Sequence, residues 1–578
     1  MHGENFNTSF VYDYYEGDFR MINNLLRASE YKDPRARMPL LPVRIVKTWG
    51  RVLNADALLE DSPAQAFLGK FSGCVMINTC GSERAAVLLD FGAEFHGSCR
   101  LTAGMIDGGV KFARLKIRFG ESVSEAVSEL GYKNAGCDHA CRDQEVVMSG
   151  LSVHETNESG FRFAYIELMD DKAVGLVNVH GVMIYRDIER LGKFSCSDPL
   201  IEKIWETAVY TVHMCMQEYL WDGIKRDRLV WMGDMHTEIL TILTAFGKQD
   251  VIEKSLDFMK IHTPASDWMN GLPSYSLWWV IANRDLYMRT GDRDYLLKQE
   301  EYLKQLSKRL IDIVDEDGCE QIPPKKFLDW PTSDDDAASH EGMQGLLKTA
   351  LDAAADMLAE MGNDALSEKC RIKAELMKKH IPEASGNLAA ASILALSGVS
   401  DAKETNDKII KPTGAKGYSC LMGGYILNAK AKAGDITGAL NDMRAYWGGM
   451  LSMGATTFWE DFSLDWLDNA SPLTDFVPEG KRDIHGDFGA YCYKNLRHSF
   501  CHGWASGPVP FITENVLGVK AIEPGYKKVS IKGNLGDLEY AKGEVPTPYG
   551  IIKVCLSKNE SGETVSEISV PEGIEIVK

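Results

Sequence analysis

Residues 221–238, WDGIKRDRLVWMGDMHTE, combine side chains that a solvated loop does not need. The stretch carries four acids (Asp222, Asp227, Asp234 and Glu238), three basic residues, a histidine and two tryptophans. Carboxylates accept hydroxyl hydrogen bonds and exchange protons, while an indole ring offers an apolar platform. This combination predicts a pocket that binds a polyhydroxylated ring and moves protons. The alternative is a buried salt-bridge network at a helix start, where acids commonly cap the backbone.

A second acidic stretch, LDWPTSDDD at 328–336, surrounds a tryptophan. Consecutive aspartates are usually solvated, so residues 334–336 are predicted to cap the following helix or to hold a cation. Asp329 lies beside Trp330, and this pair is the predicted ligand contact.

Two later stretches add a carboxylate and a histidine. GATTFWEDF at 454–462 places Glu460 after Trp459 at the end of a run of small residues, where packing alone does not favour an acid. SFCHGWASGP at 499–508 places His502 and Trp504 among glycines at a helix start, where small residues allow close approach of a ligand. The alternative for a lone histidine is a purely structural role.

Composition restricts the possible partners. The 578 residues are 45% hydrophobic and 25% charged, which indicates a globular protein of two to four domains. The net charge of −20 argues against nucleic acid or an anionic membrane surface as a partner. Neutral ligands remain compatible with that charge.

Neither a membrane span nor an export signal is predicted. The sequence contains no run of about eighteen apolar residues, and its first ten residues lack a basic and an apolar segment. We therefore expect a cytoplasmic protein as the sequence stands, or a periplasmic or secreted one if a signal once preceded it.

No metal ion or organic cofactor is predicted. The thirteen cysteines are scattered, mostly inside apolar runs, as reduced core thiols are. The densest cluster, CDHAC at 137–141, lacks two further ligands at a spacing recognisable as a zinc site.

The elements that must position these residues change type twice along the chain. From about 39 to 193 the apolar period is two, as at 85–91, 110–119 and 161–168, which predicts an antiparallel β-sandwich for a domain spanning 1–195. Helical patterns follow in a domain spanning 196–518, among them 274–290, 294–314 and 339–361; their number suggests a toroid of six inner and six outer helices. Strand patterns return at 519–578 and predict a small β domain.

In this order the motifs resemble the α-L-rhamnosidase family, glycoside hydrolase family 78. The resemblance rests on DGIKRDRLVWMGD, then DW, GATTFWE, the histidine at the last helix start, and finally PGYKK, GDL and PTPYG, and it extends from about residue 40 onward. It implies a multidomain fold with an N-terminal antiparallel β-sandwich, a central (α/α)6 toroid and a small C-terminal β domain. It also implies an inverting hydrolase of terminal α-L-rhamnosyl or similar residues, with carbohydrate as its partner.

Roles follow from matching each motif. The resemblance implies Asp227 as the general acid and Glu460 as the general base. The predicted substrate-binding residues are Asp222, Arg226, Trp231, Asp234, Asp329, Trp330, Trp459, His502 and Trp504.

The sequence departs from the family pattern at three points. Aspartate stands at 227 where relatives carry glutamate, Gly223-Ile224 replaces a Cys-Pro pair, and the motif is one residue shorter. A shorter acid displaces the proton donor by about an ångström, and catalysis is sensitive to such displacements. Three alternatives therefore stay open: a hydrolase of other specificity on the same barrel, a role for Glu238 as the acid, and a catalytically silent carbohydrate-binding protein. Both arginines beside Asp227 would lower its pKa, so we expect one to turn away and pair with a carboxylate such as Asp222 or Asp234.

Overall fold

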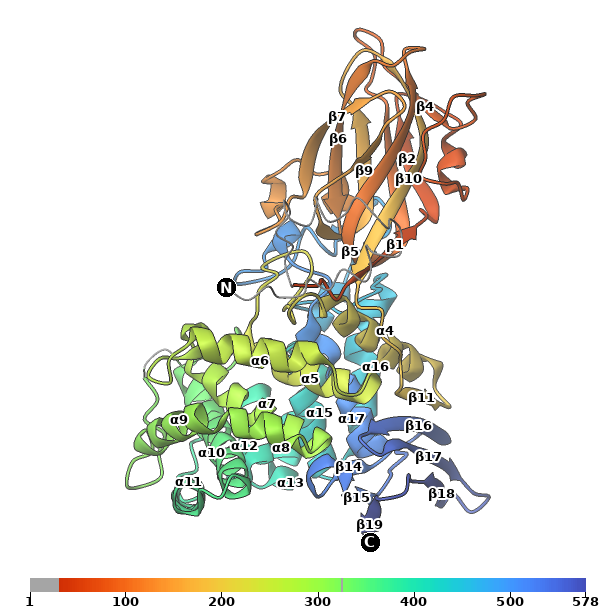
Figure 1. The fold of residues 1–578 in the computed structure, drawn as a ribbon. Helices are drawn as coiled ribbons and strands as arrows, with labels where there is room; N and C mark the ends of the chain where they lie inside the picture. The colour runs from red at the N-terminus through yellow and green to blue at the C-terminus, as the bar shows by residue number, and fades with distance from the viewer. Residues whose placement is uncertain (1–30, 324–325, 578) are drawn as a thin grey trace, which may run out of the picture.

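The computed structural model describes residues 31–323 and 326–577. Figure 1 shows a β domain standing on a body of helices, with small sheets packed beside the last helices. The first thirty residues of the predicted domain 1–195 lie outside the described part.

The N-terminal domain is an antiparallel sheet of ten strands organised around one long strand, β5. The strands are β1 (Ala36–Leu40), β2 (Arg44–Trp49), β3 (Arg51–Leu53), β4 (Cys74–Ile77), β5 (Ala86–Ile106), β6 (Phe112–Gly120), β7 (Asp143–Ser149), β8 (Val153–Glu155), β9 (Ser159–Leu168) and β10 (Ala173–Tyr185). Strand β5 pairs with β2 and β9 in its first half and with β10 and β8 in its second half. Its bulges let it bend between these partners. The enclosed core is rich in phenylalanine.

Helices begin where Asp198 caps the chain. Its side chain accepts a hydrogen bond from the Leu200 amide at 2.9 Å, and Pro199 occupies the first helical turn. The longer helices are α4 (Pro199–Cys215), α5 (Met232–Ala245), α6 (Asp250–His262), α7 (Pro273–Thr290), α8 (Arg293–Lys298), α9 (Glu300–Asp312), α10 (Asp336–Glu360), α11 (Asp364–Met377), α12 (Leu388–Ser397), α15 (Gly423–Lys432) and α16 (Ile436–Ser452). The predicted helix 294–314 is two helices, α8 and α9, which meet at the buried Gln299.

Two small sheets close the chain. One contains β11 (Lys193–Cys196), β16 (Tyr540–Thr547), β17 (Gly550–Lys558) and β18 (Thr564–Ser569), and the other contains β14 (Val519–Ala521), β15 (Lys528–Ile531) and β19 (Glu575–Val577). Strand β11 precedes the helices yet pairs with β16, so the chain enters the helical body from the C-terminal sheet. The hydrophobic core of the helices continues into this sheet through residues such as Val545 and Ile552.

Among the described residues, no helix is both long and apolar enough to cross a bilayer.

Candidate active site

A cavity of about 460 Å³ lies among the loops that join α4 to α5, α6 to α7, α9 to α10, and α16 to α17 (Pro508–Phe511). Its walls combine carboxylates with aromatic rings. The lining residues are Asp222, Arg226, Asp227, Trp231, Asp234, Asn270, Leu272, Tyr275, Lys326, Phe327, Trp330, Ser333, Glu460, Cys492, His502 and Trp504.

Nine of the eleven residues singled out from the sequence line this cavity, and Asp329 and Trp459 do not. Asp329 is buried and closes its own loop, because its carboxylate accepts hydrogen bonds from the Thr332 amide at 3.0 Å and the Ser419 hydroxyl at 2.8 Å. Trp459 is fully buried and stacks on Phe500 with ring centroids 4.2 Å apart. Both therefore act through packing and loop closure in this structure.

The loop that carries Asp227 is held from both domains. Ile224 packs into the core of the β domain, so this departure from the family's Cys-Pro pair anchors the loop in apolar surroundings. His139, from the loop before β7, hydrogen-bonds to the Asp227 carbonyl at 2.8 Å. Asp227 and Arg228 have φ values of 57° and 53°, in the left-handed region that most side chains avoid. The contacts from both domains hold this turn in place.

Arg226 lies between the two carboxylates predicted to be catalytic. Its guanidinium forms an ion pair with Glu460, and its other terminal nitrogen lies 3.4 Å from the Asp227 carboxylate. Arg228 does turn away, but its partners differ from those expected. It donates to the His139 carbonyl at 2.6 Å and lies over the Trp221 ring, instead of pairing with a carboxylate.

The charge around Glu460 favours its ionised form. Burial alone would raise the pKa of this carboxyl, but the positive charge of Arg226, with smaller contributions from His502 and His498, holds the pKa below its usual value. Glu460 is 4% exposed, so water screens this interaction only weakly. A buried carboxylate kept ionised in this way can accept a proton.

His502 contacts one acid of the first motif, and the next residue, Gly503, contacts the backbone of another. Its Nε2 lies 2.9 Å from Asp234, and the Gly503 amide donates to the Asp222 carbonyl at 2.9 Å. Burial lowers the pKa of His502, but the hydrogen bond to Asp234 and the charge of Glu460 outweigh burial and raise it. Burial raises the pKa of Asp222 well above its usual range, and the nearby Asp234 and Asp227 raise it further, while the charge of His502 acts in the opposite direction. Asp222 and His502 thus both have a raised pKa in the folded protein.

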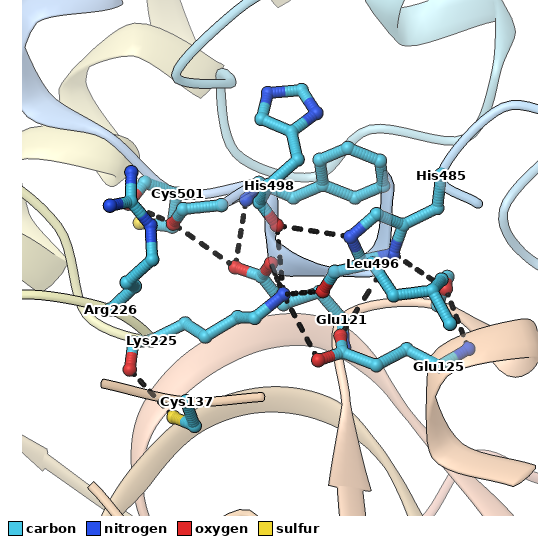
Figure 2. A network of polar contacts seen from close by, with 12 residues as sticks. Glu121, Glu125, Cys137, Lys225, Arg226, His485, Leu496, His498 and Cys501 are labelled. Carbon is cyan, nitrogen blue, oxygen red and sulfur yellow. Dashed lines mark hydrogen bonds and ion pairs between the residues drawn. The ribbon is translucent and has the colours of Figure 1, made fainter. Parts of the chain in front are cut away.

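Lys225 anchors the loop that carries Asp227 through buried polar contacts (Figure 2). Its ammonium group lies 3.1 Å from Glu121 and 3.0 Å from Glu125, and it donates to the carbonyls of Leu496 and His498 at 2.8 Å. All of these side chains are buried. Glu121, Glu125 and His485 are also close enough to hold a metal ion, but the lysine ammonium already supplies the positive charge there.

Glu238, the alternative acid, does not line the cavity. It is fully buried beneath Gly503, and neither of its carboxylate oxygens has a hydrogen-bond partner among the described residues. Burial, with the nearby Cys215, raises the pKa of this carboxyl well above its usual range. Its position is that of a buried packing group beneath Gly503.

Several lining residues were not anticipated from the sequence. Lys326 and Phe327 directly precede the predicted Asp329 stretch, so a wider window would have included them. Tyr275 lies in the first turn of α7 within an apolar run, and Cys492 lies in an irregular segment. From the sequence alone, neither Tyr275 nor Cys492 can be distinguished from a residue of the hydrophobic core.

The candidate zinc cluster at 137–141 has other partners. The Cys137 thiol hydrogen-bonds to the Lys225 carbonyl at 2.7 Å, and His139 contacts Asp227 as described above. These contacts assign the segment to loop positioning.

Comparisons with known proteins agree with this architecture. Residues 189–396 match the family described as the bacterial α-L-rhamnosidase six-hairpin glycosidase domain, and residues 518–577 match the bacterial α-L-rhamnosidase C-terminal domain. A curated α-L-rhamnosidase of Alteromonas sp. (strain LOR) is 23% identical over 475 residues, covering 72% of this chain and 47% of the relative. The chain therefore spans about half the length of that relative.

Solved structures show the same fold. A GH78 family rhamnosidase of Bacillus sp. GL1 superposes with a TM-score of 0.70 at 20% identity, covering 90% of this chain and 55% of that one. A rhamnosidase of Klebsiella oxytoca with rhamnose bound superposes with a TM-score of 0.64 at 18% identity, covering 86% of this chain and 97% of that one.

The helical domain and its matched residues define the class: this is a six-hairpin glycosidase fold, preceded by a ten-stranded β domain and followed by small β sheets. Both family matches, over residues 189–396 and 518–577, are to domains of bacterial α-L-rhamnosidases, and on these matches the chain belongs to the bacterial α-L-rhamnosidase family, glycoside hydrolase family 78.

Proposed function

We propose that this protein is an inverting glycoside hydrolase that releases terminal α-L-rhamnosyl or closely similar deoxy-sugar residues, with Asp227 as general acid and Glu460 as general base. The observation that carries the proposal is that both carboxylates line one cavity and contact the same guanidinium, that of Arg226. Inversion requires two carboxyl groups about 6.5–9.5 Å apart, with the sugar and a water between them. Because the guanidinium of Arg226 lies between the two carboxyl groups, it keeps them apart, as an inverting mechanism requires.

Glu460 suits the role of base because its carboxylate is ionised and buried. It would take a proton from a water molecule as the water oxygen bonds to the anomeric carbon. Arg226 would orient this carboxylate and keep it charged until the proton arrives.

Asp227 is assigned the role of acid because it is the carboxyl group more accessible to the leaving group of a substrate, with a side chain 22% exposed against 4% for Glu460. Its proton would pass to the glycosidic oxygen as the bond from that oxygen to the anomeric carbon breaks. Arg226 contacts Glu460 more closely than it contacts Asp227, so its positive charge lies nearer to the proposed base.

The remaining lining residues suit a deoxy sugar. Asp222, Asp234 and His502 offer hydrogen bonds to ring hydroxyls, while Trp231, Trp330 and Trp504 offer apolar faces to the ring and its methyl group. The rhamnosidases of similar fold include one solved with rhamnose bound, and this supports a rhamnosyl or similar deoxy sugar as the substrate.

The test is hydrolysis of a panel of p-nitrophenyl glycosides, beginning with the α-L-rhamnoside. We expect turnover by the wild type and a loss of roughly two or more orders of magnitude in kcat for both Asp227→Asn and Glu460→Gln. The Asp227→Asn defect should be smaller for leaving groups that depart without protonation, whereas the Glu460→Gln defect should not depend on the leaving group. Proton NMR of the first product should show β-L-rhamnose, since inversion converts an α-glycoside into a β-hemiacetal.

Two outcomes would replace this proposal. Turnover of another glycoside but not of the rhamnoside would assign a different sugar to the same barrel. If no glycoside were cleaved while L-rhamnose still raised the melting temperature, the cavity would be a carbohydrate-binding site without this chemistry.

A further inference from the structure

Three potential metal ligands meet outside the candidate active site, where the loop after α9, the start of α10 and the end of α11 converge. Cys319 lies in the loop, His340 in the first turns of α10, and His380 just beyond α11. One ligand atom from each residue lies within 4.8 Å of the other two. All three side chains are partly exposed, so an ion could reach them from solvent.

We propose that Cys319, His340 and His380 form a binding site for a divalent transition metal, with zinc as the ion of best fit. A thiolate and two imidazoles are ligands that zinc prefers and that magnesium and calcium do not. Three protein ligands leave the fourth tetrahedral position for water.

The distance between the two histidines matches a tetrahedral zinc site. The Nε2 atoms of His340 and His380 lie 3.3 Å apart. Zinc–nitrogen bonds of 2.0–2.1 Å in a tetrahedron place two nitrogen ligands about 3.3 Å from each other. The two rings therefore stand where one ion can bind both without rearrangement of the backbone.

Glu320 gives His340 the support that metal-binding histidines usually have. Its carboxylate lies 2.6 Å from His340 Nδ1, which directs the proton to that nitrogen and leaves Nε2 free to bind a cation. The same carboxylate accepts from the Ile322 amide at 2.7 Å, and its side chain is fully buried. A carboxylate in this position also adds negative charge next to the proposed ion.

Gln344 holds the three ligand-bearing segments in register. It lies one helical turn after His340 and is fully buried. Its amide nitrogen donates to the carbonyls of Gly318, at 2.8 Å, and Met377, at 3.1 Å, and its oxygen accepts from the Glu320 amide at 2.9 Å. The site is therefore built before an ion arrives, which lowers the entropic cost of binding.

The surrounding charge also favours a cation. Asp315 accepts from the Cys319 amide at 2.8 Å, and Asp317 lies in the same turn. Two lysines also lie nearby: the Lys326 ammonium pairs with Glu320 at 2.6 Å, and the Lys373 ammonium donates to the carbonyl of Val314 at 2.8 Å.

The experiment is cobalt titration of the full chain after treatment with a chelator and its removal. We expect one equivalent of Co²⁺ to produce a thiolate-to-cobalt charge-transfer band and the visible bands of a tetrahedral ion, and one equivalent of Zn²⁺ to abolish both. Zinc should also raise the melting temperature of the wild type.

Cys319→Ser should remove the charge-transfer band. His380→Ala should weaken cobalt binding by more than about 100-fold, because loss of a residue that only supports a metal ligand typically costs about 10–100-fold. The matched controls Cys80→Ser and His262→Ala, at exposed positions elsewhere, should leave both signals unchanged. Absence of tetrahedral bands in the wild type would overturn the proposal, and so would their persistence in both ligand variants.

Discussion

Arg226 is the residue whose removal should change the pH dependence of activity most directly. The kcat/KM of the free enzyme falls on the acid side when the base becomes protonated. Glu460 has a lowered pKa despite its burial, because Arg226 opposes the effect of burial.

We therefore expect Arg226→Met to move the acid limb of kcat/KM to higher pH by at least about one unit, in addition to lowering activity. The measurement is the pH profile of aryl rhamnoside hydrolysis. Arg228→Met is the matched control, since that guanidinium contacts a backbone carbonyl and should leave the limb in place. An unmoved limb in Arg226→Met would show that this pair does not set the pKa of the base.

Glu238 should make the protein less stable as pH rises. Its pKa is raised in the folded protein, so the folded state keeps a proton that the unfolded chain releases above about pH 4.3. Wild-type stability then falls with rising pH, by up to roughly 1.4 kcal/mol per unit, until the folded pKa is passed.

Glu238→Gln removes this titration, so the melting temperature of the variant minus that of the wild type should increase between pH 4.5 and neutrality. Thermal unfolding at several pH values measures it. The exposed Glu479→Gln should give a difference that does not change with pH. If the melting-temperature difference between Glu238→Gln and the wild type did not change with pH, folding would not raise the pKa of this carboxyl.

At the level of elements, the loop between α4 and α5 depends on the buried contacts of Lys225. Its ammonium forms ion pairs with Glu121, directly after β6, and with Glu125, in α3 (Val123–Val127), both in the other domain. Removing one partner of a buried ion pair typically costs about 3–5 kcal/mol, because the other charge is left in an apolar site.

Lys225→Met should therefore lower the stability by about that amount, measured as a fall in melting temperature and denaturant midpoint. Adding Glu121→Gln and Glu125→Gln should restore part of the loss. The control is Lys416→Met, whose exposed pair with Asp465 is expected to be worth less than about 1 kcal/mol. If Lys225→Met and Lys416→Met lowered the stability equally, the buried ion pairs of Lys225 would not be what stabilises this loop.

The sequence predicted some features of the helices and loops but not others. Helix positions followed from apolar spacing and caps such as Asp198, and the acids of the first motif followed from their density. The break at Gln299 depends on a buried side-chain contact with Asp257, at 3.1 Å, that no local pattern reports. The packing of Ile224 into the β domain and the inward position of Asp329 likewise depend on distant segments. Tertiary contacts of this kind are invisible to periodicity.

For the whole molecule, the C-terminal sheet is part of the helical core. Val545, Ile552 and Leu556 belong to the same buried cluster as the helices, and β11 has its partner there. Deletion of everything after Leu517 should therefore yield an insoluble or protease-sensitive protein.

Truncation after Lys558 is the matched comparison, because it removes only β18 and β19, whose side chains are mostly exposed. This shorter deletion should leave a soluble protein with a modestly lower melting temperature. Soluble yield and limited trypsin digestion distinguish the two. A stable, soluble protein ending at Leu517 would show that the helices fold independently of the sheet.

The turn at Asp227 also limits which acid this position accepts. Aspartate tolerates a left-handed backbone better than glutamate does, because its short polar side chain can hydrogen-bond locally. Asp227→Glu would therefore lengthen the reach of the proposed proton donor at the cost of added backbone strain.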